Sequence, residues 1–197
     1  MSKRAGTGPR LIFLAGPNGA GKSTFFETFL QDTGLPFVNA DRIGAALGIS
    51  ASEAAAAADA ARAQLLAERM SFITETVFSD PVGAKLQFLR DAIAAGYSVT
   101  LYFIGISSAQ LSGARVAQRV RAGGHDVPPE RLERRFRQSL ENLRQALKFV
   151  PETHVYDNSS SEVPYRLVLS LRESRSEFVA DPLPGWLKRP SQNIFDP

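Results

Sequence analysis

The chain alternates short apolar runs with longer segments in which apolar residues recur at helical spacing. Residues 11–15 form a continuous apolar run, which is typical of a parallel strand buried on both faces. Residues 22–31 then carry phenylalanine and leucine at helical spacing, and residues 98–104 give the clearest strand pattern of all. Strands that alternate with helices predict a mostly parallel sheet with right-handed crossovers, which binds ligands at the carboxyl ends of its strands.

The remaining elements follow from the same patterns. The alanine-rich segment 50–70 is predicted as one long helix, because Ser50 or Ser52 can cap it and alanine has the highest helix propensity. A break rich in glycine and proline at residues 123–129 separates two arginine-rich helices, and we interpret it as a hinge or the tip of a lid. Further strands are predicted at 36–38, 71–75, 153–156, 165–171 and 177–179, and further helices at 42–47, 81–95, 110–122 and 129–149.

Composition narrows the class of protein. With 197 residues, 44% of them hydrophobic, we expect a single domain over residues 1–180, with a lid at about 110–140 and a C-terminal surface arm at 181–197. The net charge of +3 is small, so it favours a phosphate-bearing small ligand over nucleic acid. No cysteine is present, which excludes a disulfide scaffold and a cysteine-based zinc site and leaves Mg²⁺ as the expected metal. Neither a signal peptide nor a membrane-spanning segment is indicated, so we expect a cytoplasmic protein.

The strongest motif is GPNGAGKST, which begins at Gly16 and lies between a predicted strand and a predicted helix. It fits the pattern G-x-x-x-x-G-K-[ST] of a phosphate loop, in which backbone amides and a helix N-terminus bind the phosphates of ATP or GTP. Lys22 is expected to reach the β- and γ-phosphates, and Ser23 to bind Mg²⁺ through its hydroxyl. The expected nucleotide-binding residues are Gly16, Asn18, Gly19, Ala20, Gly21, Lys22, Ser23 and Thr24.

Two carboxylates follow predicted strands at the same edge of the sheet. Asp41 follows the second strand, where it could accept the proton of an attacking hydroxyl, although it could also cap the helix at 42–47. Glu75 ends the third strand and, with Thr76, is a candidate for binding the acceptor; a solvated charge at a strand end is the alternative. The turn that starts at Asp157 could line the nucleobase pocket or be a simple turn.

The predicted lid is rich in arginine. Phosphoryl transfer needs such groups, because the charge on the moving phosphoryl must be neutralised while water is excluded. Arg115 and Arg119 lie one helical turn apart and share a face, and we place Arg115 with the acceptor site; several of the others must point to solvent. The arginines of this region are Arg115, Arg119, Arg121, Arg131, Arg134, Arg135 and Arg137.

These features predict an enzyme, a Mg²⁺-dependent kinase that moves the γ-phosphoryl group of ATP or GTP to the hydroxyl of a small molecule, with Asp41 as the base. Two alternatives remain open. One is a nucleotide-dependent regulatory module that hydrolyses ATP slowly and acts on a protein partner. The other is a kinase of nucleic-acid ends, because the predicted lid is basic.

Seven segments together resemble the zeta-toxin-like P-loop kinases: GPNGAGKST, FVNADRI, SFITETVFS, GYSVTLYFIGI, RVAQRVRAGGHDVP, RRFRQSLENL and VYDNS. The resemblance covers roughly residues 10–160. It implies a three-layer α/β P-loop NTPase fold of the adenylate-kinase type with a helical, arginine-rich lid. It also implies phosphorylation of UDP-N-acetylglucosamine and an antitoxin protein as a partner.

Matched position by position, Lys22 resembles the phosphate-loop lysine of this family, Asp41 its general base and Glu75 its acceptor-binding glutamate. Arg119 and Arg135 resemble the lid cations that act in catalysis. The third strand of the toxins carries a motif similar to Glu-x-Thr-x-Arg, whereas here Thr76 follows Glu75 directly and no arginine follows.

Overall fold

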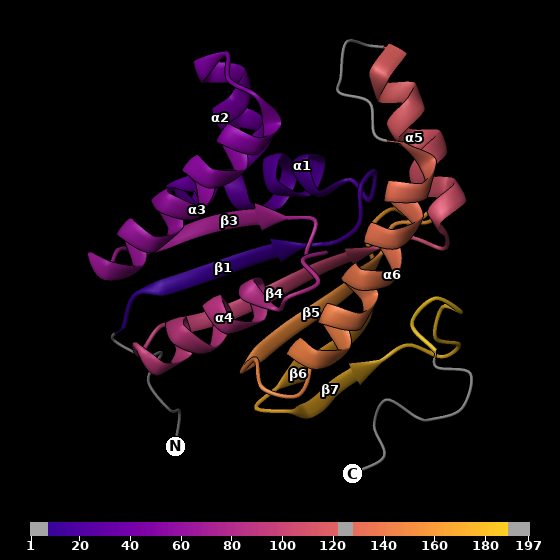
Figure 1. Cartoon of the computed structure of the whole chain (residues 1–197). Coiled ribbons are helices and arrows are strands. Elements are labelled where there is room, and N and C mark those ends of the chain that lie inside the picture. The colour runs from indigo at the N-terminus through magenta and orange to yellow at the C-terminus, as the bar shows by residue number, and fades with distance from the viewer. Residues whose placement is uncertain (1–7, 122–127, 189–197) are drawn as a thin grey trace.

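A seven-stranded sheet forms the centre of the molecule in the computed structural model, which describes residues 8–121 and 128–188 (Figure 1). The strand order is β2-β3-β1-β4-β5-β6-β7; the first five strands of this order run parallel and the last two pair antiparallel. The predicted, mostly parallel sheet is therefore confirmed. The strands are β1 (Arg10–Ala15), β2 (Phe37–Val38), β3 (Phe72–Thr76), β4 (Ser98–Gly105), β5 (Glu152–Asp157), β6 (Arg166–Arg172) and β7 (Arg175–Val179).

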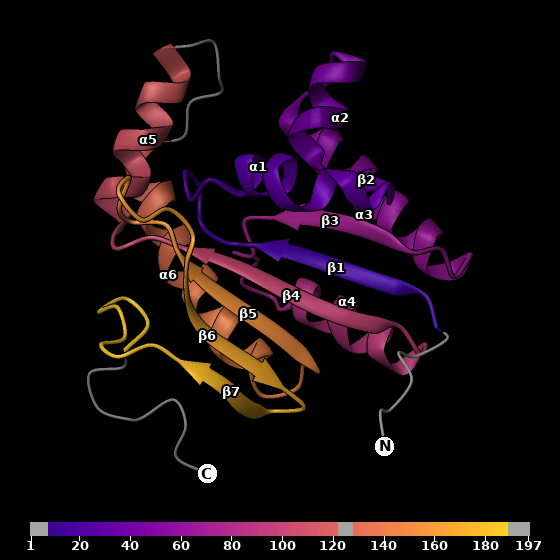
Figure 2. The ribbon, with the colours of Figure 1, turned by 180° about the vertical axis from the view of Figure 1, so that it is seen from behind.

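Helices cover the two faces of the sheet unequally. Figures 1 and 2 show α3, α4 and α6 on one face and α1 on the other, whereas α5 projects from the carboxyl edge of the sheet. On the face of α1, β5 and β6 carry no helix in front of them (Figure 2). The helices are α1 (Lys22–Phe25), α2 (Ala40–Leu47), α3 (Ala51–Ala67), α4 (Ala84–Ala94), α5 (Ala109–Arg121) and α6 (Pro129–Ala146).

Aromatic side chains fill the core on both sides of β1. Phe13 is fully buried and meets Phe78 edge-on at 5.3 Å between ring centroids on the side of α4. On the side of α1, Phe25 packs against Tyr102 at 5.6 Å and Tyr156 at 5.2 Å. These contacts fix α1, and with it the loop that precedes it, against the carboxyl halves of β4 and β5.

The predicted helices differ from the observed ones at their ends, for local reasons. The helix predicted at 22–31 continues from α1 as a π-helical turn, Phe26–Leu30, and a 3₁₀ turn, Gln31–Thr33. The helix predicted at 81–95 begins only at α4, because Gly83 before it has a left-handed φ of 76°. Of the two predicted caps, Ser50 is the one present, and it forms a capping box in which Ser50 and Glu53 bond each other's backbone amides.

The C-terminal arm differs most from the prediction. Its described part, residues 181–188, packs on the domain, with Trp186 9% exposed and Leu187 2% exposed. The domain therefore extends past residue 180, and residues 189–197 lie outside the described part of the chain. The predicted lid tip at 123–129 also falls largely outside it, since residues 122–127 are not described. None of the described helices is long and apolar enough to cross a membrane.

A buried arginine joins α3 to the sheet. Arg62 is 6% exposed and donates to Thr74 Oγ1 of β3 at 3.0 Å. It also donates to Asp59 Oδ1 at 2.5 Å, and Lys85 of α4 binds the same oxygen. Burial raises the pKa of Asp59, but the hydrogen bonds and charges of Arg62 and Lys85 outweigh burial and hold that pKa below its ordinary value.

The variant Asp59→Asn should lower the free energy of unfolding by roughly 1 kcal/mol near neutral pH, because the half-exposed pair is partly screened by solvent. Because the pKa of Asp59 is lowered in the folded protein, its carboxylate stabilises the fold at pH values above its ordinary pKa. This contribution is lost as the pH falls through the lowered pKa. The difference from wild type should therefore shrink in acid. Urea denaturation as a function of pH measures it, with Asp32→Asn, at an exposed position, as the control. A difference that stays constant into acid would contradict this assignment.

Candidate functional site

The predicted phosphate loop connects β1 to α1 at the carboxyl edge of the sheet. Gly16 has φ 143°, and a Cβ there would lie 2.1 Å from the carbonyl oxygen of Ile104 in β4. The loop therefore leaves β1 by passing directly against the next strand, which only glycine permits. Gly21 precedes α1 with a left-handed φ of 91°, so the chain turns into the helix at the residue before Lys22.

Side chains from outside the loop bind the carbonyl groups of its central residues. In a trans peptide the N–H points in the direction opposite to the C=O. When the carbonyl groups are held on the outside of the loop, the N–H groups of the same peptides therefore point to its inside, where a phosphate group can bind. The donors come from α5, from the turn after β5 and from the residue before β6. The bonds run from Ser112 Oγ to Asn18 O (2.7 Å), Arg115 Nη1 to Gly19 O (3.4 Å), Asn158 Nδ2 to Ala20 O (2.9 Å) and Tyr165 OH to Gly21 O (2.8 Å).

Lys22 lies at the centre of a polar network. Its side chain is 6% exposed, and Nζ donates to the carbonyl oxygen of Pro17 at 3.1 Å and lies 3.6 Å from Glu75 Oε1. Glu75 is 10% exposed and accepts a hydrogen bond from Asn39 Nδ2 at 2.7 Å. The start of α1, the residue after β2 and the end of β3 thus bring a cation, an amide and a carboxylate together at the carboxyl edge of the sheet.

Asn39 is a site residue that the sequence analysis missed. It is 6% exposed and caps α2, since its Oδ1 accepts from the amide of Arg42 at 2.8 Å. The cap of this helix is therefore Asn39, and the alternative in which Asp41 caps a helix at 42–47 is wrong. The signal was available, because asparagine directly after a strand is as favoured a cap as aspartate.

Asp41 instead lies in the first turn of α2, with its carboxylate exposed. Its negative charge acts on Arg135 of α6. Burial lowers the pKa of the Arg135 guanidinium, the positive charges of Arg131 and Arg134 lower it further, and Asp41 raises it. Asp41 and Arg135, both predicted site residues, therefore lie within electrostatic reach of each other although they come from different elements.

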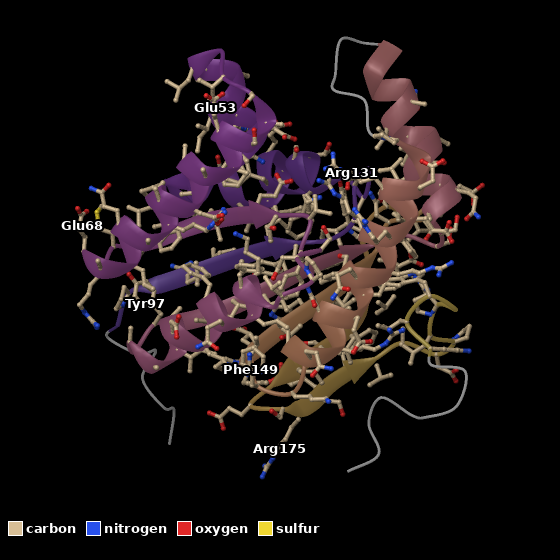
Figure 3. The ribbon with its side chains drawn as sticks, viewed as in Figure 1. Glu53, Glu68, Tyr97, Arg131, Phe149 and Arg175 are labelled. Carbon is tan, nitrogen blue, oxygen red and sulfur yellow. The ribbon has the colours of Figure 1, made fainter. Side chains whose placement is uncertain are left out.

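The arginines of the predicted lid differ in where they lie and in what they contact. Arg131 lies near the start of α6, on the side of that helix toward α1 and α2 in the view of Figure 3. Arg137 is 77% exposed and pairs with Glu133 of its own helix, as expected for an arginine that only adds surface charge. Arg119 lies on α5, but its side chain is outside the described part of the structure.

Arg115 lies in a different place from the one expected. Besides Gly19, its guanidinium donates to the carbonyl oxygens of Asn158 at 2.9 Å and Ser159 at 3.5 Å. These contacts place it against the phosphate loop and the turn after β5, on the nucleotide side rather than beside Glu75. Asn158 itself holds the loop from outside, which differs from a residue that lines the nucleobase pocket.

Thr76 and the hydroxyls of the loop have distinct surroundings. Thr76 Oγ1 accepts a hydrogen bond from the amide of Phe78 at 3.1 Å, where the chain takes a left-handed φ of 59°.

Ser23 and Thr24 are exposed in the first turn of α1. Among the described residues no group of three acidic or histidine side chains gathers as in an all-protein metal site. An exposed hydroxyl beside a phosphate loop nevertheless fits Mg²⁺, which takes most of its ligands from substrate phosphates and water.

Gly21 allows a sharp test of the loop geometry. A Cβ at this position would lie 2.6 Å from Asn158 Nδ2 and 2.9 Å from Tyr165 OH, in addition to the strain of its positive φ. Gly21→Ala should therefore displace the side chains that hold the loop and weaken ATP binding by about 100-fold or more, by the usual cost of misplacing a binding group.

The matched control is Gly34→Ala. Gly34 has a similar φ of 66°, but a Cβ there would meet nothing within 4 Å. It should lose about 1 kcal/mol of stability from strain alone and bind ATP as wild type does. Isothermal titration calorimetry measures the affinities and thermal denaturation the stabilities. Equal losses of affinity in the two variants would mean that strain alone, and not the contacts with Asn158 and Tyr165, limits binding.

Comparison with solved structures supports the fold. A chain in the complex AvrRxo1-ORF1:-ORF2 with ATP superposes with a TM-score of 0.71 at 16% identity, over 95% of this chain and 67% of that chain. In the sulphate-bound form of that complex, this chain spans only 61% of the neighbour's length. A chain of the PezAT toxin–antitoxin system of Streptococcus pneumoniae gives a TM-score of 0.63 at 16% identity, over 85% of this chain and 74% of that chain.

Two comparisons rest on sequence. An uncharacterized protein of Haemophilus influenzae is 28% identical over 133 residues, which is 64% of this chain and 92% of that protein. The family model for zeta toxin matches residues 44–168, which include Glu75, the whole of α5 and α6, and Tyr165. With more than half of the chain matched and the expected P-loop kinase fold present, this chain belongs to the zeta toxin family.

Proposed function

We propose that this protein is a nucleotide-dependent kinase that transfers the γ-phosphoryl group of ATP or GTP to the hydroxyl of a small molecule. Membership of the zeta toxin family and the intact phosphate loop support a phosphotransferase. The observation that carries the proposal is the meeting of Lys22, Glu75 and Asn39 in one network at the carboxyl edge, with Asp41 and Arg135 in electrostatic reach of each other.

The phosphate loop and Lys22 would bind the nucleotide. The inward amides of the loop would donate hydrogen bonds to phosphate oxygens, and the ammonium group of Lys22 would move from Glu75 and Pro17 to the β- and γ-phosphates. Ser23 would hold Mg²⁺ through its hydroxyl, and the ion would neutralise phosphate charge when bound. Arg115, with its contacts on the loop and the turn after β5, belongs to this nucleotide side.

Asp41 would act as the general base. Its exposed carboxylate accepts the proton of the acceptor hydroxyl while the hydroxyl oxygen bonds to the γ-phosphorus. The bond from that phosphorus to the bridging oxygen breaks, and the nucleoside diphosphate leaves with the electron pair. Once Lys22 has left it, Glu75 presents a carboxylate that can bind hydroxyl groups of the acceptor, with Thr76 beside it.

Arg135 would stabilise the charge of the moving phosphoryl. Partial burial and two neighbouring arginines make its guanidinium a poorly solvated cation, which gains most from a nearby anion. Arg119 on α5 is the second cation that we propose for this role, since it shares a helix with Arg115 near the loop.

For the acceptor we propose a nucleotide sugar such as UDP-N-acetylglucosamine, as in the zeta toxins. The match of the family model across Glu75 supports it. The same support extends to an antitoxin partner, because the neighbours of this fold include a chain of the PezAT toxin–antitoxin system. Thr76 follows Glu75 directly in this chain, without the arginine that follows in the toxins, and a panel of acceptors tests whether the same nucleotide sugar is used.

The central experiment is transfer of the γ-phosphoryl group from labelled ATP or GTP, with Mg²⁺, to a panel of nucleotide sugars, small hydroxyl metabolites and oligonucleotides. Label on UDP-N-acetylglucosamine would support the toxin-like acceptor. Label on another compound would keep the kinase and replace its substrate. Free phosphate alone, released at a rate that no acceptor changes, would contradict a kinase and favour a regulatory module.

Asp41→Asn should abolish transfer, with a fall of about 100-fold or more in kcat, because general-base catalysis contributes about 10²–10⁴-fold. The affinity for ATP should stay near that of wild type, since Asp41 is assigned to the acceptor's proton and not to the phosphates. Asp32→Asn, which also neutralises an exposed aspartate, is the matched control and should leave both unchanged. Wild-type turnover in Asp41→Asn would refute the assignment of the base.

Arg135→Ala should lower kcat by about 100-fold or more and change KM much less, because its charge acts on the transition state. Arg137→Ala removes an arginine two positions along the same helix that is 77% exposed and paired with Glu133, and should leave both constants near wild type. Steady-state kinetics with the acceptor found in the panel measures both. An equal effect of the two substitutions would indicate a general loss of lid charge instead of a role for Arg135.

A further inference from the structure

Trp186 is the only tryptophan of the chain and lies in the C-terminal segment, far in sequence from the phosphate loop. Its ring packs against the end of β4, with its centroid 6.2 Å from that of Phe103. A Cβ on Gly105 would lie 2.1 Å from Trp186 Cη2. The indole therefore occupies the space that the missing side chain of Gly105 leaves open.

The indole N–H of Trp186 reaches the turn after β5. It donates to Asp157 Oδ1 at 3.2 Å, and the Asp157 side chain is only 14% exposed. The same oxygen accepts from the amide of Ser159 at 3.1 Å and from the Ser159 hydroxyl, and Asp157 Oδ2 lies 3.8 Å from Arg166. The carboxylate thus closes an Asx turn over residues 157–159, and Trp186 holds that carboxylate from the side.

Asn158 lies at the centre of this turn and is 8% exposed. The backbone amide of Asn158 donates to Gly105 O at 2.8 Å, so the turn is fixed to the end of β4, on which Trp186 also packs. Its side chain donates to Ala20 O at 2.9 Å and accepts from the amide of Tyr165 at 3.3 Å. The orientation of the turn therefore sets the direction of the Ala20 carbonyl and, through the planar peptide, of the Gly21 amide.

We propose that Trp186 is a positioning residue of the nucleotide site, acting through Asp157 and Asn158 on the phosphate loop. This inference rests on the proposed nucleotide binding. Phosphate binding depends on amide groups held within a fraction of an ångström of their places, so a partner that fixes the turn changes affinity without touching the nucleotide. The C-terminal segment would then support nucleotide binding in addition to packing on the hydrophobic core.

The competing explanation is that Trp186 only fills space. Leu187, its neighbour, provides the comparison, since it is 2% exposed and packs in the same hydrophobic core. Trp186→Phe keeps an aromatic ring over Gly105 and removes the N–H donor, whereas Leu187→Ala removes buried apolar volume and leaves the donor in place.

Calorimetric titration with MgATP and with MgGTP, together with thermal denaturation, distinguishes the two explanations. Trp186→Phe should weaken binding of the nucleotide that wild type prefers by about five- to tenfold, the loss expected for one hydrogen bond to a carboxylate. Leu187→Ala should lose at least as much thermal stability and bind within about twofold of wild type. Unchanged affinity in Trp186→Phe, or an equal loss in Leu187→Ala, would overturn the proposal.

A double-mutant cycle with Asn158→Ala tests the route. If Trp186 acts through Asn158, Trp186→Phe should add nothing once Asn158 Nδ2 is absent, whereas independent effects would multiply. Multiplying effects would overturn the relay. Wild-type protein that binds neither nucleotide would overturn both the proposed function and this inference. Wild-type binding that stays unchanged in Trp186→Phe would overturn this inference alone.

Discussion

The arrangement of the site depends on the outward direction of the carbonyl groups in the phosphate loop. A loop of small residues has little of its own to hold it in one conformation, because glycine leaves the backbone its freedom. Here the bonds from Ser112, Arg115, Asn158 and Tyr165 supply that constraint from outside. The inward amides follow from the planarity of the peptide, so the anion site is preorganised before any nucleotide arrives.

The charge of Lys22 imposes a second constraint. A cation that is 6% exposed needs a counter-charge, and Glu75 at 3.6 Å provides it. Glu75 is in turn held by Asn39, which also caps α2 and so fixes the helix that carries Asp41. Binding of phosphate would supply Lys22 with a different anion and release the carboxylate of Glu75 for the acceptor. In the proposed kinase, this buried pair would connect the nucleotide side of the site to the acceptor side.

Local signals made most of the fold predictable, and the site only in part. The apolar run of β1, the glycines of the phosphate loop and the serine that caps α3 are short-range patterns, and each appears where it was predicted. The residues that hold the loop come from far along the chain; Asn158 lies 138 positions and Tyr165 144 positions from the residues they bind. A single sequence carries no sign of such pairings, because an asparagine in a turn and a tyrosine before a strand are ordinary in themselves. Trp186 was missed for the same reason, since only the contact with Gly105 shows why a glycine ends β4.

In the proposed kinase, contacts of α5 and α6 with the core limit which part of the predicted lid can move. Ser112 and Arg115 tie the first turns of α5 to the phosphate loop, and Asn142 of α6 donates to the carbonyl oxygens of Phe78 and Asp80 at 3.0 and 3.1 Å. Because α5 is bound to the core at its first turns and α6 through Asn142, the closing motion that we propose would be confined to the parts of these helices farther from the sheet. Arg115 would then stay with the nucleotide throughout. Arg131 and Arg135 lie in the first half of α6, and we propose that closure would bring them toward the phosphates, so that charge neutralisation and exclusion of water would occur in the same step.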